Sequence, residues 1–305
     1  MSNFNTLLAK RLLLFSCWIL LSFLLFRNPV IALVRLSLAH DDASYLILIP
    51  FISGWILYAE RDRVFLHLSS DKTLGSTLLF LSGCVALASG LARNGSSLGL
   101  QLSGWIVSLV LVWVAGFALL FGKTSLKAGH FPLLFLSLMV PLPDFLLDHI
   151  IRLLQEGSAW ITGAFFDLVG VPALRDGLVF HLARVNIEVA KECSGIRSSM
   201  ALLILALLIS HFRLKNFWNK ILFVACGLFM MILKNGIRIA TLTLLAVYVD
   251  PGFLLGRLHH QGGVVFFVLA LLLLLPLLFF LQRMESKRSV APEPSQIAQR
   301  SSLPK

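Results

Sequence analysis

The stretch that decides the fold is Gly262–Leu281, which reads GGVVFFVLALLLLLPLLFFL and contains no charged residue. About 20 predominantly apolar residues in a helix are long enough to cross the hydrocarbon core of a bilayer. Over the whole chain of 305 residues, 58% are hydrophobic and 13% are charged. A soluble domain carries about 25% charged residues. We therefore expect an integral membrane protein.

Other apolar runs of similar length lie upstream of this stretch. Val30–Leu38 is apolar too, but it is short and contains Arg35, so it extends the first hairpin or lies at the membrane interface. We expect an all-α polytopic membrane protein with about eight transmembrane helices. The expected spans are Leu12–Arg27, Tyr45–Tyr58, Leu74–Ala92, Leu98–Phe121, Phe131–Leu147, Ile196–Phe212, Phe217–Val249 and Gly262–Leu281.

Basic residues gather in the loops and ends on one side of these spans, which predicts the orientation. Cytoplasmic loops of membrane proteins carry an excess of Lys and Arg. Both termini are therefore expected in the cytoplasm, and the long stretch His149–Glu192 on the opposite side. The same distribution explains the net charge of +11 without nucleic acid. The basic clusters are Lys10/Arg11, Arg61/Arg63/Lys72, Lys123/Lys127, Arg213/Lys215/Lys220 and Arg283/Lys287/Arg288.

The chain divides into a membrane domain, residues 1–284, and a tail, residues 285–305, that is rich in Ser, Pro, Gln and basic residues. We expect the tail to be disordered and cytoplasmic. At the outer surface, Pro141–Asp144 should break a helix. Leu146–Phe166 has apolar residues at roughly helical spacing and is expected to lie along the membrane surface.

The end of this loop is expected to form a small hairpin that leads directly to a cysteine. Val185, Ile187 and Val189 alternate with polar residues, which is typical of a strand. With Leu178–Leu182 they form a hairpin that precedes Cys193.

Cys193 differs from the other cysteines because it lies among polar residues, in Glu192-Cys193-Ser194-Gly195, at the start of an apolar run. Cys17, Cys84 and Cys226 each lie inside a hydrophobic segment, where a cysteine behaves as a small hydrophobe. A cysteine beside charges, near the start of a helix, can ionise and react. The four dispersed cysteines form no paired spacing, so neither a disulfide framework nor a metal site is expected, and no cofactor is implied.

Three polar groups are predicted at one depth, near the outer interface. The run Phe217–Val249 is longer than one crossing, which places Arg238 close to the outer boundary. His259 and His260 directly precede the last span, and Cys193 precedes the sixth. A thiolate, an imidazole and a guanidinium can together perform acyl transfer. Taken singly, the arginine can snorkel, a histidine can cap a helix and a cysteine can pack, so spacing alone supports a transporter equally well.

At these residues the chain resembles the exosortase/archaeosortase family of integral-membrane cysteine transpeptidases, from about Tyr45 to Leu281. Cys193–Gly195 matches the cysteine motif of that family and Asn235–Ile239 its arginine motif. His259, with Gly263 four residues later, matches the histidine motif. The resemblance implies that the catalytic residues are Cys193, Arg238 and His259, supported by His260, Glu192, Ser194 and Asn235.

The resemblance also implies a function. Such enzymes are sortase-like thiol proteases that cleave C-terminal sorting signals of the PEP-CTERM kind and pass the new carboxyl end to an acceptor, here unknown. They accompany exopolysaccharide production in Gram-negative bacteria. The expected partners are sorting-signal proteins and the lipid bilayer, and the expected location is the bacterial inner membrane, with the site on the periplasmic side. The alternative is a non-enzymatic transporter or assembly component of an exopolysaccharide system. Charged residues throughout the membrane depth would favour the transporter, whereas polar groups gathered at one face favour the enzyme.

Overall fold

The computed structural model describes residues 2–92, 97–183, 185–191, 195–250, 252 and 257–290. The chain forms two compact units, residues 1–149 and residues 150–305. Glu192, Cys193 and Ser194 lie outside the described residues, as do residues 291–305 of the expected tail.

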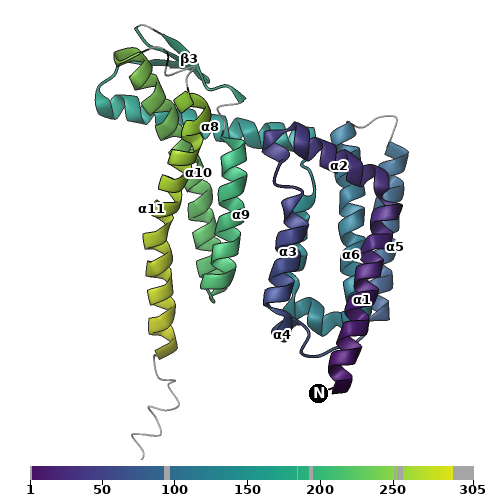
Figure 1. Cartoon of the computed structure of the whole chain (residues 1–305). Helices are drawn as coiled ribbons and strands as arrows, with labels where there is room; N and C mark the ends of the chain where they lie inside the picture. Colours follow the sequence, from purple (N-terminus) through teal and green to yellow (C-terminus); the bar gives the residue numbers. More distant parts are fainter. Residues whose placement is uncertain are drawn as a thin grey trace, which may run out of the picture. The chain divides into compact units, whose positions relative to one another are not determined.

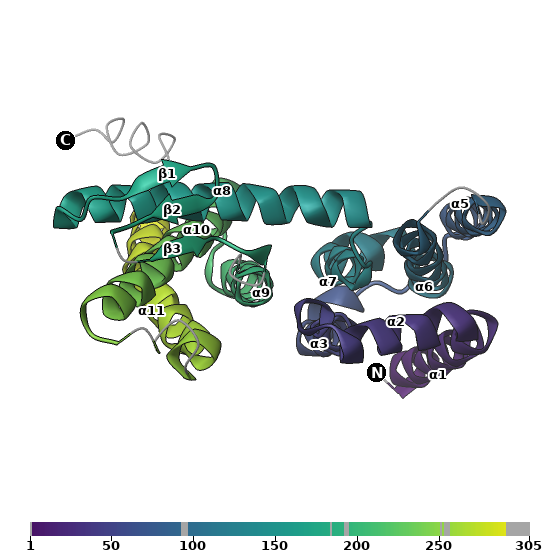
Figure 2. The same ribbon diagram turned by 90° about the horizontal axis from the view of Figure 1, so that it is seen from above.

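The first unit is a bundle of helices with one helix laid across their ends. The helices α1, α3, α5 and α6 run in roughly the same direction, and α2 lies across the ends of α1 and α3 (Figures 1 and 2). α2 is the short run for which the sequence left two possibilities, and its transverse course agrees with an interfacial position. The elements are α1 Ser2–Leu25, α2 Arg27–Ala39, η1 Asp41–Ala43, α3 Leu48–Ala59, α4 Arg61–Val64, α5 Lys72–Leu91, α6 Leu98–Ala128, α7 His130–Phe135 and η3 Leu136–Met139.

α6 is the central helix of this unit, and polar side chains tie its neighbours to it. Ser82 on α5 and Ser108 on α6 hydrogen-bond through their hydroxyls at 2.8 Å. On α1, Ser22 Oγ accepts a hydrogen bond from Trp113 Nε1 at 2.7 Å. Such contacts position membrane helices, because lipid tails are as apolar as the side chains and give no net hydrophobic drive. α6 kinks at Gly122, whose φ of 81° favours glycine. The predicted span ended one residue earlier.

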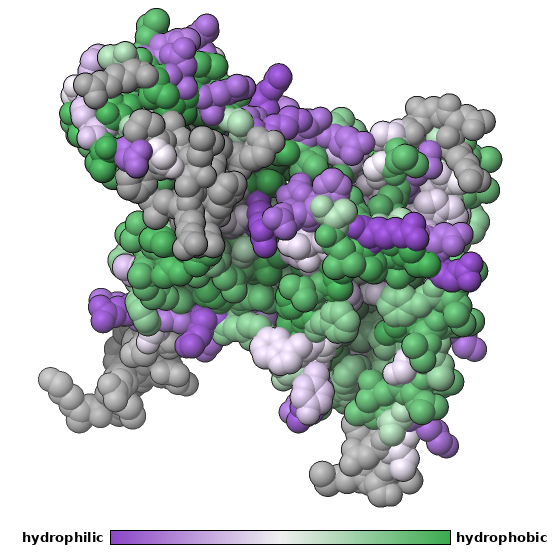
Figure 3. Space-filling view, turned by 45° about the horizontal axis from the view of Figure 1, so that its top comes forward, coloured by the Kyte–Doolittle hydropathy of each residue, from purple (hydrophilic) through white to green (hydrophobic). Residues whose placement is uncertain are grey.

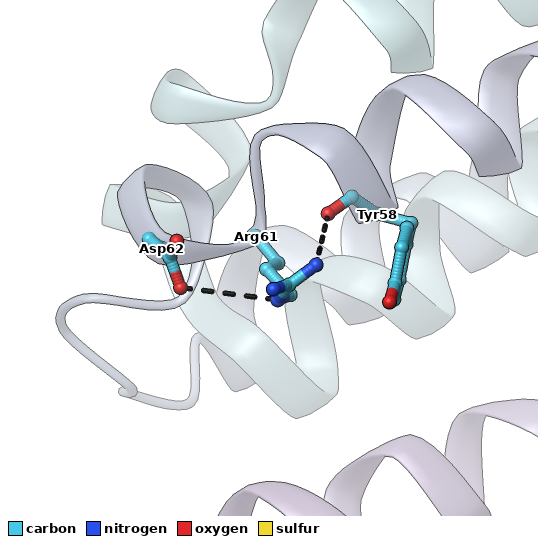
Figure 4. Close-up of polar contacts among 3 residues, drawn as sticks. All are labelled: Tyr58, Arg61 and Asp62. Carbon is cyan, nitrogen blue, oxygen red and sulfur yellow. Dashed lines mark hydrogen bonds and ion pairs between the residues drawn. The ribbon is translucent and has the colours of Figure 1, made fainter.

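The short helix α4, which follows α3, carries exposed charges of the kind that mark a chain leaving the membrane. The guanidinium of Arg61 lies 4.5 Å from the ring centroid of Tyr58 and donates a hydrogen bond to its carbonyl oxygen at 3.4 Å. Its Nε also lies 3.9 Å from Asp62 Oδ1 (Figure 4). Because both charged side chains are at least half exposed, this pair contributes little to stability.

The run Phe131–Leu147 does not form the single continuous helix that the sequence suggested. α7 and η3 end at Met139, and the chain turns by 95° before α8 begins at Asp144. The prolines at 141 and 143 explain the break, because neither can donate a backbone hydrogen bond to a continuing helix. Leu146–Phe166 accordingly lies within a separate helix, as expected from its spacing.

The second unit consists of three membrane helices, one crossing helix and a small sheet. α8 crosses the end of the group formed by α9, α10 and α11, with the sheet beside it (Figure 2). α11 continues to Val290, so residues 285–290 are helical although the tail was expected to start there. The elements are α8 Asp144–Val169, β1 Leu174–Asp176, β2 Val179–His181, β3 Asn186–Glu188, α9 Ile196–Arg213, α10 Phe217–Tyr248 and α11 Arg257–Val290.

The sheet is antiparallel in the order β1-β2-β3, and its β2–β3 hairpin is the one predicted from the alternating pattern. Phe180 pairs with Ile187 in the centre of that hairpin. β1 was not predicted, because its three residues are all exposed and lack alternation. Phe180 and Val189 are fully buried in one core with Phe166 of α8 and Ala240 of α10. The sheet is therefore packed against the helices that carry the candidate site.

Among the described residues, seven helices are long and apolar enough to cross a membrane, or eight if the pair bent at Pro141–Pro143 counts as one span. Hydrophobic residues cover most of the helix sides, and hydrophilic residues gather toward their ends (Figure 3). The protein is therefore an all-α multi-pass membrane protein, which confirms the predicted fold class.

Candidate active site

The structure describes the expected site residues to different extents. Arg238 lies in α10 and is partly buried. His259 and His260 lie in the first turn of α11, where the backbone is helical, and their side chains are not among those described. Cys193 falls between two described residues, Lys191 and Gly195. The site is therefore built from Arg238 and from the residues that flank the cysteine.

Gly195 brings the cysteine motif against the arginine motif. It is the N-cap of α9 and has φ 70° and ψ 19°, a left-handed conformation that side chains disfavour. A Cβ at this position would lie 2.8 Å from Asn235 Oδ1, so the backbone of Gly195 is in direct contact with Asn235 on α10. Two segments separated by forty residues of sequence thus meet, and only glycine satisfies both the backbone angle and the close approach.

Asn235 is held in turn by α8. Its Nδ2 donates a hydrogen bond to Ser158 Oγ at 3.0 Å, and both side chains are buried. One turn further along α8, Thr162 Oγ1 lies 2.8 Å from the carbonyl oxygen of Ser158 and 3.1 Å from that of Gly236. Polar groups buried among apolar surroundings must be paired in this way to avoid a desolvation penalty. α8 therefore fixes the position of the arginine motif on α10.

α8 also holds the chain that leads to Cys193. Gln155 Nε2 donates a hydrogen bond to the carbonyl oxygen of Val189 at 2.6 Å, and the amide of Val189 donates to the carbonyl oxygen of Leu178 at 2.9 Å. Cys193 is four residues after Val189 and two before Gly195. The loop that carries it is thus anchored at both ends, by α8 on one side and by Asn235 on the other.

Lys234 is a further charged residue of this site, and it was missed from the sequence. It is only 8% exposed, and its ammonium donates a hydrogen bond to Ser198 Oγ on α9. Ser198 Oγ donates in turn to the carbonyl oxygen of Gly195 at 3.1 Å. Arg238 follows one helical turn later on the same side of α10. The available signal was a lysine inside an apolar run, since ionisable residues within membrane helices commonly mark function.

The contacts between α10 and α11 show how far along the helix axis the histidines lie relative to Arg238. Lys234 and Ile237 on α10 line the same small cavity as Phe266 and Ala270 on α11. His259 precedes Phe266 by seven residues, so its backbone lies about 10 Å further along the axis of α11. The structure thus places His259 at the same end of the unit as Arg238, though beyond it rather than level with it.

The charged side chains that the structure describes on α10 at this site are both cationic. Lys234 and Arg238 are these two positive groups, and Lys234 contacts the first turn of α9, where the helix dipole also favours negative charge. Within the described part of the chain, no three His, Cys, Asp or Glu side chains come together as a metal site would require. The arrangement suits the stabilisation of an anion, such as a thiolate or the oxyanion of a tetrahedral intermediate.

The fold and site together define a class: multi-pass α-helical membrane proteins whose polar residues converge at one end of their helices. Within this class, the family model described as transmembrane exosortase matches residues 36–276. The chain therefore belongs to the transmembrane exosortase family, as its motifs predicted. This membership supports a membrane transpeptidase or protein-sorting role in broad terms. A search of curated proteins gave no match, and a search of solved structures gave none.

Proposed function

We propose that this protein is a membrane-embedded cysteine transpeptidase that cleaves C-terminal PEP-CTERM-like sorting signals and transfers the new carboxyl end to an acceptor. The observation that carries the proposal is the contact between Gly195 and Asn235, within a chain that belongs to the transmembrane exosortase family. This contact brings the segment containing Cys193 against the helix that contains Arg238. A nucleophile and a cationic oxyanion stabiliser are the minimum that acyl transfer requires.

The reaction would proceed in two steps. In the first, the thiolate of Cys193 attacks the scissile carbonyl, and the guanidinium of Arg238 stabilises the oxyanion. His259 then protonates the leaving amine, and a thioester remains on Cys193. In the second step, His259 takes a proton from the acceptor, which attacks the thioester and releases the thiolate. An imidazole suits both transfers, because its unperturbed pKa of about 6.5 lies near neutrality.

Asn235, Glu192, Ser194 and His260 complete the site as supporting residues. Asn235 has a defined task in this proposal, since it links the cysteine segment to α8 through Ser158. The substrates are exported proteins with a short motif, a membrane helix and a basic cluster at the C-terminus. The proposed setting is the bacterial inner membrane, in connection with exopolysaccharide export.

The nucleophile is tested by replacing Cys193 with alanine. A reporter protein ending in a PEP-like motif, a membrane helix and a basic cluster is co-expressed, and its shortening is followed by gel mobility. We expect Cys193→Ala to accumulate normally and to leave the reporter uncut, because a lost nucleophile is not compensated. Cys226→Ala is the matched control, since Cys226 lies within α10 of the same unit. Reporter cleavage by the Cys193→Ala variant would exclude the cysteine mechanism and favour a non-enzymatic role.

The orientation is tested separately. The basic clusters support cytoplasmic termini and a periplasmic site. A membrane-impermeant maleimide should therefore label Cys193 in intact spheroplasts and leave Cys17, Cys84 and Cys226 unlabelled. Labelling of Cys193 only after lysis would place the site in the cytoplasm.

A further inference from the structure

Lys234 carries a buried positive charge that its described surroundings do not balance. The side chain is 8% exposed, and its one hydrogen-bond partner among the described residues is the neutral hydroxyl of Ser198. An ammonium has three donors to satisfy. Burying an uncompensated charge in a protein costs several kcal/mol. Buried charged residues are therefore retained mainly where the charge has a function.

The described residues of α9, α10 and α11 around Lys234 include no compensating anion. On its own helix, the nearest charged group is the cation Arg238, one turn later. On α9, the facing group is the hydroxyl of Ser198. α11 presents only apolar side chains to the small cavity that Lys234 lines, namely Phe266, Leu269, Ala270 and Leu273. Among the residues that the structure describes, none supplies a carboxylate in ion-pair contact with Lys234.

The hydrogen bonds of Lys234 lead toward the cysteine. They run from its ammonium to Ser198 Oγ, and from there to the carbonyl oxygen of Gly195. Cys193 is two residues before Gly195, and successive Cα atoms are about 3.8 Å apart, so the two Cα atoms are within about 7.6 Å. Two cations on neighbouring turns repel each other, and an anion close to both removes that repulsion.

We infer that Lys234 is a further positioning residue of the site, whose charge acts with that of Arg238 to stabilise the thiolate of Cys193. This inference rests on the proposed function. The step that it assists is ionisation: the S–H bond breaks, its electron pair stays on sulfur, and the proton passes to His259 or to water. Lys234 takes no part in this proton transfer. Arg238 is then left to interact with the substrate oxyanion while Lys234 holds the resting thiolate.

The test measures thiolate formation directly, without substrate. The full chain carrying Cys17→Ala, Cys84→Ala and Cys226→Ala retains only Cys193. It is purified in detergent, and the rate of alkylation by iodoacetamide is measured at pH 7 and at pH 9.5. Lys234→Gln keeps a donor for Ser198 and removes the charge. We expect it to lower the rate about tenfold at pH 7 and by less than about twofold at pH 9.5, since only the thiolate reacts.

Three matched variants separate charge from structure. Lys234→Arg retains the charge and should stay within about threefold of the parent rate at pH 7. Ser198→Ala removes the hydrogen bond, keeps the charge, and should also stay within about threefold. Lys220→Met removes a cation from the same helix roughly 21 Å away along its axis, beyond the Debye length at physiological salt, and should have no effect. Lys234→Met serves as a second neutral variant if Lys234→Gln does not accumulate.

The outcomes are decisive in both directions. An unchanged rate at pH 7 in a stable neutral variant overturns the inference. An equal loss at both pH values, or an equal loss in Ser198→Ala, shows a structural role instead. The proposed function has its own test in reporter cleavage by Cys193→Ala, so failure of one is distinguishable from failure of the other.

Discussion

Replacing Gly236 with alanine tests whether α8 positions the site. Gly236 follows Asn235 on α10 and faces α8. An added Cβ would lie 2.5 Å from both Cβ and Cγ2 of Ile161, and 2.9 Å from the carbonyl oxygen of Ser158. Non-bonded carbon atoms settle at about 3.5 Å or more, so the two helices must separate by about 1 Å locally.

The magnitude follows from that displacement. The hydrogen bond from Asn235 Nδ2 to Ser158 Oγ would lengthen from 3.0 Å, as measured in the native site, to about 4 Å, beyond hydrogen-bonding range. Overpacking costs about 1–3 kcal/mol, and the gain in helix propensity from glycine to alanine returns about 1 kcal/mol. We expect a net loss of stability of about 1 kcal/mol. A misplacement of about 1 Å at a catalytic site costs about 100-fold in rate, so processing should fall far more than stability.

The assay compares Gly236→Ala with Gly227→Ala, the same substitution on the same helix. A Cβ at Gly227 would meet Ala206 Cβ at 3.2 Å, which requires a shift of only a few tenths of an ångström. We expect Gly227→Ala to process a tailed reporter within about twofold of wild type, and Gly236→Ala about 100-fold more slowly. Thermal unfolding in detergent monitors stability. If the two variants process the reporter equally well, α8 does not position the arginine motif and the reasoning is refuted.

Three further predictions concern the site and its frame. Arg238→Lys should process the reporter at least tenfold more slowly, because an ammonium cannot replace the planar fork of a guanidinium; near-normal turnover would show that Arg238 only reaches toward lipid headgroups. His259→Ala should stop processing and His260→Ala should be much milder, because successive residues of a helix are about 100° apart around its axis; similar turnover in both variants would show that the proton donor is misassigned. Glu285→Gln should lower the stability of the second unit by about 1 kcal/mol, because the carboxylate accepts hydrogen bonds from the amides of Lys215 and Asn216 and from Asn219 Nδ2; an unchanged melting temperature in detergent would argue against it.

The membrane fold was predictable because it depends on local properties of the sequence. Apolar runs located the spans, and α9 begins at Ile196, as the run beginning there predicted. Alternation located the β2–β3 hairpin. The helix break expected at Pro141–Asp144 is present as a bend of 95°, and the expected span Phe131–Leu147 was wrong only in running past it. In the structure, the backbone restriction of Pro141 and Pro143 prevails.

The support of the site was not predictable, because it depends on pairs of residues distant in sequence. Ser158 and Asn235 are 77 residues apart, and neither residue alone indicates a partner. Gln155 and Thr162 similarly look like ordinary polar residues of a surface helix. Lys234 did give a local signal, since a lysine in an apolar run is unusual, but the neighbouring arginine motif drew attention away from it. The motif residues themselves were singled out by their spacing and then by resemblance, and their roles are proposals.

The two sides of α8 differ in the residues that they carry. The side toward the protein includes Gln155, Ser158 and Thr162, while Leu153, Trp160 and Leu168 are exposed on another side. The buried side also includes Ile151, Ala159 and Phe166, so apolar packing holds the helix against its neighbours while the polar residues fix its register. Replacing Gln155, Ser158 and Thr162 with apolar residues would leave α8 at the membrane interface. It would remove the hydrogen bonds that fix the register of α8 against its neighbours. The polar residues thus determine the position of α8 rather than its affinity for the membrane. The geometry of the site should therefore depend on how strongly the surrounding lipid or detergent competes for these hydrogen bonds.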